Sequence, residues 1–129
     1  MNKKFILNIA IVVFFVMFVY SGIIKIKNFD KKSTILAKKI NCTKLIANIG
    51  MVLVILLEII GSLYLISYIL FMKDNKNIYR TLALICLTLY LIFMVVVTFI
   101  YHPPTDKLIP FMSNLTTFGG FLLILYVII

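Results

Sequence analysis

Residues Leu45 to Met72 have the sequence LIANIGMVLVILLEIIGSLYLISYILFM, and this stretch decides the fold. It contains no Lys, Arg or Asp and a single carboxylate, Glu58, near its middle. A bilayer core about 30 Å thick needs roughly 20 apolar residues of helix, so the stretch is long enough to span it. An ionisable group at that depth is costly and usually faces a partner inside a helical bundle. The rest of the chain is expected to supply that partner.

The composition of the whole chain is typical of a membrane protein. Of its 129 residues, 64% are hydrophobic and only 13% are charged, and the mean hydropathy is +1.16. A soluble domain of this size could not cover so much apolar surface. The net charge of +9 comes from lysines placed between apolar runs, where lipid headgroups rather than nucleic acid are the expected partners. We therefore predict a multi-pass integral membrane protein that contacts the lipid bilayer and binds no nucleic acid.

Four apolar runs predict four membrane spans, which cover residues 5–24, 45–72, 81–101 and 113–129. The first run is too long for the apolar core of a signal peptide, so we expect an uncleaved span. The pair Pro103–Pro104 ends the third span, and Pro110 marks a further break before the fourth. Residues 30–44 could form a short interfacial helix, with a solvated connector as the alternative. Short connections predict one domain, an all-α antiparallel four-helix transmembrane bundle.

Small residues mark the faces along which these helices are expected to pack. Gly50 and Gly61 share a helical face with Glu58, because their spacing follows the helical period. Small side chains let helix backbones approach closely within a membrane. The glycines predicted to mediate such packing are Gly22, Gly50, Gly61, Gly119 and Gly120.

Polar residues gather on one side of the predicted bundle, because alternating spans bring the first and third loops to the same face. Asn48 and Tyr101 belong to this group, and its candidate binding residues are Glu58, Lys25, Ser21, Tyr20, His102 and Asn114. Lys25 reaches Glu58 only if the first span tilts or its side chain points inward. Tyr20, Ser21 and His102 are the alternative partners. A functional pocket and a purely structural hydrogen-bond network both satisfy a buried acid, so both interpretations stay open.

The sequence predicts neither a metal site nor catalytic residues. Cys42, Cys86 and His102 do not have the spacing of metal ligands. No motif for flavin, haem or an iron–sulfur cluster is present, so we expect no redox catalysis by the chain alone. Since histidine titrates near neutral pH, a proton or small-solute pathway through Glu58 and His102 is one alternative function.

The ordered set of motifs resembles the DoxX-like family of four-span membrane proteins and the related surfeit-locus cargo receptors. Residues 21–25 (SGIIK), followed by Phe29-Asp30, are similar to the family's Ser-Gly-x-x-Lys and Phe-acid pattern. Residues 58–61 (EIIG) match its Glu-x-x-Gly in the second span. His102 stands where the family often has a histidine, and residues 114–123 are similar to the start of its fourth span.

This resemblance implies a non-catalytic accessory or small-molecule-binding subunit of a membrane oxidoreductase system. Glu58 and Lys25 would line its internal polar site. Quinone is a candidate ligand by this resemblance alone, and oxidoreductase subunits are candidate partners. The surfeit-locus relatives imply an alternative, a cargo receptor or assembly protein that binds secretory proteins.

Overall fold

The computed structural model describes residues 2–72, 77–103, 105 and 107–129. Four helical stretches in these ranges are long and apolar enough to cross a membrane: Lys3–Lys27, Lys44–Met72, Asn77–Tyr101 and Leu108–Ile128. The elements are α1 (Lys3–Lys27), α2 (Phe29–Ile40), α3 (Lys44–Leu56), the π-helical η1 (Leu57–Gly61), α4 (Ser62–Ser67), the π-helical η2 (Tyr68–Met72), α5 (Asn77–Tyr101) and α6 (Leu108–Ile128). The predictions of an all-helical chain and of four helices of membrane-spanning length are confirmed.

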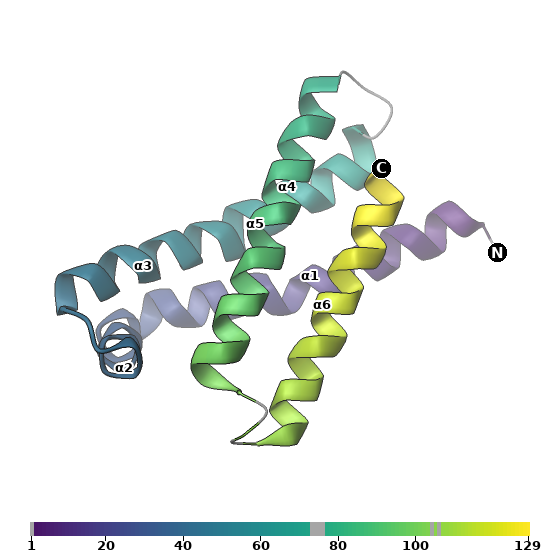
Figure 1. Cartoon of the computed structure of the whole chain (residues 1–129). Coiled ribbons are helices and arrows are strands. Elements are labelled where there is room, and N and C mark those ends of the chain that lie inside the picture. Colours follow the sequence, from purple (N-terminus) through teal and green to yellow (C-terminus); the bar gives the residue numbers. More distant parts are fainter. Residues whose placement is uncertain (1, 73–76, 104, 106) are drawn as a thin grey trace.

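The helices form two pairs that cross each other (Figure 1). In the first pair, α1 packs against the continuous helix from α3 to η2, which runs in the opposite direction, and α2 joins the two. In the second pair, α5 and α6 pack side by side, also in opposite directions. The second pair lies across the first at a steep angle instead of running along it. Two crossing pairs touch closely only near the crossing, so space between them widens away from it.

Aromatic side chains fill the region where the pairs cross. Phe15 and Phe18 of α1 pack there against Tyr90 of α5 and Phe121 of α6. The rings of Tyr90 and Phe121 are stacked with their centroids 4.8 Å apart, and the Phe18 and Tyr90 centroids are 5.2 Å apart. All four side chains are buried. Large aromatic side chains contribute much of the packing where they meet, so this cluster ties the two pairs together.

Three of the predicted packing glycines lie where helices approach most closely. A Cβ atom on Gly22 would lie 2.6 Å from the Ile59 side chain, and one on Gly120 would lie 2.5 Å from the Phe14 ring. A Cβ atom on Gly61 would lie 3.0 Å from the sulfur of Cys86 in α5. A larger residue at Gly22 or Gly120 would require the contacting side chain or its helix to shift, and one at Gly61 would require a smaller shift of the contacting sulfur.

The other two predicted packing glycines make no such contact. The nearest atom to a Cβ on Gly50 is a Leu36 methyl at 3.7 Å, an ordinary contact distance. A Cβ on Gly119 would have no described atom within 4 Å. Gly119 and Gly120 are adjacent, and neighbouring helical residues point about 100° apart, so Gly119 points away from α1 when Gly120 faces it.

Helix α2 confirms that the loop between the first two spans contains a helix. Asn41 ends it with a left-handed backbone (φ 53°), which asparagine tolerates well, and the next helix begins after Thr43. The Lys44 ammonium binds the Asp30 carboxylate at 2.8 Å, and Ser33 donates a hydrogen bond to Asn48. These contacts attach α2 to α3.

Helix α6 begins at Leu108, five residues before the predicted start of the fourth span at 113. Pro110 lies in its first turn, not in a loop as predicted. A proline is tolerated there, because the backbone N–H that it lacks would have no helical partner anyway. The fourth helix is therefore longer than the 17 residues predicted for it.

Candidate functional site

Glu58 is buried and its partner is Lys25. The Lys25 ammonium lies 2.8 Å and 3.0 Å from the two Glu58 carboxylate oxygens, and it also donates to the Ser21 hydroxyl at 2.6 Å. The Glu58 side chain is 3% exposed and that of Lys25 is 21% exposed. The pair resolves the choice among partners that the sequence left open, because the carboxylate is bound on both oxygens by one ammonium.

Close packing at Gly22 makes this ion pair possible. A Cβ on Gly22 would lie only 3.4 Å from the Glu58 Cβ, so the backbone of α1 comes very near η1. Lys25 follows Gly22 by three residues and therefore lies on nearly the same face, one turn further along α1. From there its long side chain reaches the carboxylate without a change in helix direction.

Glu58 lies in a π-helical turn, which the sequence analysis did not predict. Tyr90 of α5 donates its hydroxyl to the Leu57 carbonyl at 3.0 Å, lies 3.3 Å from the Glu58 carbonyl and is hydrogen-bonded to Ser62. Single π-helical turns within α-helices are often found at functional sites. Their backbone atoms need side-chain partners like these where the turn is buried. The wider turn is thus held by α5.

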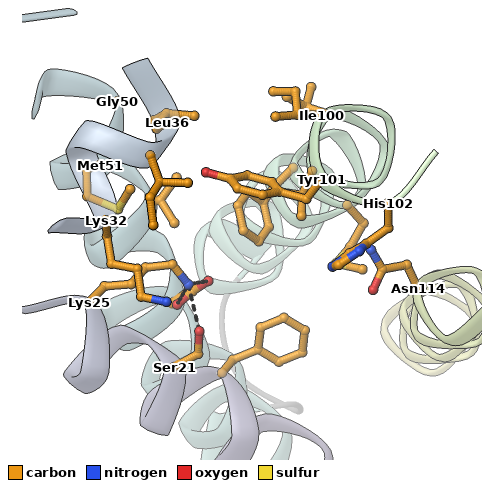
Figure 2. Close-up of a pocket in the computed structure, with 18 of the residues that line it drawn as sticks. Ser21, Lys25, Lys32, Leu36, Gly50, Met51, Ile100, Tyr101, His102 and Asn114 are labelled. Carbon is orange, nitrogen blue, oxygen red and sulfur yellow. Dashed lines mark hydrogen bonds and ion pairs between the residues drawn. The ribbon is translucent and has the colours of Figure 1, made fainter. Parts of the chain in front are cut away.

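The ion pair lines a cleft of about 610 Å³ between the two helix pairs, on the side of α2 (Figure 2). Its polar lining comes from Ser21, Lys25, Lys32, Glu58, Tyr101, His102, Asn114 and Thr117. The rest of the lining is apolar apart from Gly50, and includes Met17, Phe18, Met51, Phe93, Met94 and Val97. Such a surface, mostly apolar with a few convergent polar groups, is typical of small-molecule sites.

Five of the six predicted site residues line this cleft: Glu58, Lys25, Ser21, His102 and Asn114. Tyr20 does not. Its side chain is 65% exposed on the outside of α1. Tyr20 directly precedes Ser21, and adjacent helical residues point about 100° apart, so Tyr20 points away from the cleft while Ser21 lines it.

Lys32 and Tyr101 line the cleft but were not among the predicted site residues. A signal for Lys32 is present in the sequence, since it precedes the apolar Leu36 and Ile40 by four and eight residues and shares their helical face. Tyr101 is held by α2, because the Lys39 ammonium lies 5.3 Å from the centre of its ring. This cation–π contact connects α2 to the end of α5.

Hydrogen bonding, ion pairing and apolar packing are what this arrangement offers a ligand. Among the described residues, no group of three His, Cys, Asp or Glu side chains is placed to bind a metal ion. The cleft itself contains one histidine and one carboxylate of these types, His102 and Glu58. The prediction of no metal site stays a prediction.

Comparison of the chain with protein-family models, with curated proteins and with solved structures finds no match in any of the three. The resemblance to DoxX-like proteins therefore stays an expectation, which depends on the motifs quoted above.

Proposed function

We propose that this chain is a multi-pass membrane protein that binds a small, largely apolar molecule in the cleft beside Lys25 and Glu58. One observation carries the proposal: a buried charge pair forms part of an otherwise mainly apolar wall. Buried ion pairs cost desolvation energy and are weak contributors to stability. Within membrane helices such groups usually mark ligand or ion sites.

The cleft reaches the apolar outer surface of the protein, which supports a ligand that arrives from lipid. Met17 of α1 and Val96 of α5 are both exposed, and both also line the cleft. An apolar molecule dissolved in the bilayer could enter between them without crossing water. The exposed apolar side chains along all four long helices, which form two antiparallel pairs (Figure 1), support their insertion in a bilayer.

The roles inferred from the resemblance are narrower versions of this proposal. An accessory subunit of a membrane oxidoreductase would use the same cleft for its ligand. A proton or solute pathway finds less support, because Phe18 lines the cleft and also belongs to the buried aromatic cluster behind it. That packed cluster separates the cleft from the opposite end of the helices.

Photolabelling tests the proposal directly. The full chain in lipid nanodiscs is labelled with a long-chain alcohol that carries a photoactivatable diazirine, and the labelled peptides are identified by mass spectrometry. We expect labels on residues 93–101 and near Met17, and we expect Val54→Trp, which fills the cleft, to remove them. The matched control is Leu123→Trp, on an exposed face of α6 away from the cleft. Equal labelling of both variants would contradict the proposal.

A further inference from the structure

The charges that line the cleft do not balance. Glu58 is paired with Lys25, which leaves Lys32 as a second ammonium on the same wall. The other described carboxylate, that of Asp30, is bound by Lys44. Lys32 is half-buried and, among the described residues, forms no ion pair. The described lining therefore has a net positive charge beside a largely apolar surface.

An unsatisfied hydrogen-bond donor lies on the opposite wall. The side-chain nitrogen of Asn114 is buried and has no hydrogen-bond partner among the described residues. Figure 2 shows Lys25 and Lys32 entering the cleft from one side, with Tyr101, His102 and Asn114 lying across from them. Buried polar groups are nearly always hydrogen-bonded, and this donor belongs to a residue that lines the cleft, yet no described residue supplies its acceptor.

The two ends of the cleft differ in what they offer a ligand. Lys32 belongs to α2 and Tyr101 contacts α2 through Lys39, whereas Phe18, Phe93 and Met94 belong to the aromatic cluster or pack against it. A ligand that satisfies both parts has a negatively charged head and an apolar chain. Its head would accept from Lys32 and its chain would lie along the phenylalanines.

We propose that the ligand of this cleft is a single-chain amphiphile with an anionic head, bound through the Lys32 ammonium and the Asn114 amide. This inference rests on the proposed function and adds to it the charge of the ligand. The shared chemistry is a carboxylate or phosphate on a long apolar chain. A fatty acid and a long-chain alkyl phosphate are the two sources of that chemistry.

Equilibrium binding with three matched probes tests this inference. The full chain, purified in a neutral detergent, is titrated with oleate, oleyl phosphate and oleyl alcohol, which have the same chain and differ only in the head. We expect at least one anion to bind about tenfold more tightly than the alcohol, as expected for a charge-assisted contact. The stronger of the two anions identifies the head.

A pair of lysine variants separates a specific site from general attraction to a basic protein. Lys32→Gln should weaken binding of the preferred anion about tenfold and leave oleyl alcohol unchanged. Lys31→Gln removes the same charge from the neighbouring residue, which is exposed and does not line the cleft, and should change neither affinity. Asn114→Leu should weaken anion binding and retain the alcohol, because it removes a donor and keeps an apolar wall.

Each result decides between the two proposals. Equal effects of the two lysine variants, or an alcohol that binds as tightly as both anions, would overturn the anionic ligand and leave an apolar site standing. Failure of all three probes to bind would count against the cleft as a ligand site altogether. Thermal unfolding of each variant serves as the control, because it distinguishes a loss of ligand affinity from a loss of folded structure.

Discussion

Two regions of this molecule are built from the same helices, but one is tightly packed and the other contains a cleft. Where the helix pairs cross, Phe15, Tyr90 and Phe121 are fully buried and fill the space between them. About 15 Å further along α1, at Lys25, the pairs have diverged and a cleft separates them. The comparison shows how one crossing produces both a packed core and an unfilled site. Contact at a steep crossing is short, so the packing that holds the helices together cannot extend to their ends.

This difference predicts that the two regions respond separately to mutation. Changes at the crossing should lower the free energy of unfolding and leave ligand affinity intact. Changes to polar residues at the cleft should lower ligand affinity and leave the free energy of unfolding intact. The Lys25–Glu58 ion pair is the exception, because it should affect both quantities. The variants below test that separation, from the largest expected effect to the smallest, by unfolding in mixed micelles with a denaturing detergent.

Glu58→Ala should have the largest effect, because it leaves Lys25 without its partner in a mainly apolar surrounding. We expect the free energy of unfolding to fall by about 3 kcal/mol, the lower end for a broken buried pair, since Lys25 keeps some exposure to solvent. The double variant Lys25→Met/Glu58→Leu should recover most of that loss, yet bind ligand poorly. A single variant as stable as the original chain would mean that the pair is not buried.

Gly22→Ala should come next, because its Cβ would press against Ile59 and push α1 away from η1. Overpacking of this kind costs about 1–3 kcal/mol. Gly119→Ala is the matched control, since no described atom lies near its Cβ, and it should stabilise α6 by up to about 1 kcal/mol. If Gly22→Ala stabilised the chain as Gly119→Ala is expected to do, the close approach at Gly22 would be disproved.

Tyr90→Phe removes the hydroxyl that holds the π-helical turn and keeps the ring in the aromatic cluster. We expect a loss of about 1 kcal/mol, which is ordinary for a hydrogen bond between membrane helices. Ligand affinity should hardly change, because Tyr90 does not line the cleft. Tyr126→Phe, on an exposed face of α6, is the control and should alter neither quantity. If Tyr90→Phe changed ligand affinity and left the free energy of unfolding unchanged, the assignment of Tyr90 to the crossing and not to the cleft would be wrong.

Lys39→Gln should have the smallest effect, because it removes one exposed cation–π contact between α2 and Tyr101. Such a contact contributes about 0.5 kcal/mol at the protein surface. Amide hydrogen exchange should therefore become faster in α2 without a measurable change in global unfolding. Lys38→Gln, its exposed neighbour, should leave exchange in α2 unchanged.

The main features of the fold follow from hydrophobic runs and their breaks. Lys44–Met72 begins within one residue of its predicted start, because the apolar run begins there and the Thr43 side chain caps the first turn by accepting a hydrogen bond from the Ile46 N–H. The early start of α6 was missed because Pro110 signals a break in most positions and is harmless in a first turn. Rules that depend on position within a helix cannot be applied before its start is known.

By itself, the sequence determined four long apolar helices, a single buried acid and the polar residues most able to meet it. It did so because helical period and hydrophobicity are local properties. Only the tertiary structure decided that Lys25 is the partner of Glu58, that Tyr90 holds a π-helical turn and that Lys32 shares the cleft while Tyr20 does not. Those outcomes depend on how the helices pack within each pair and where the two pairs cross, which is set by close contacts among residues far apart in the chain.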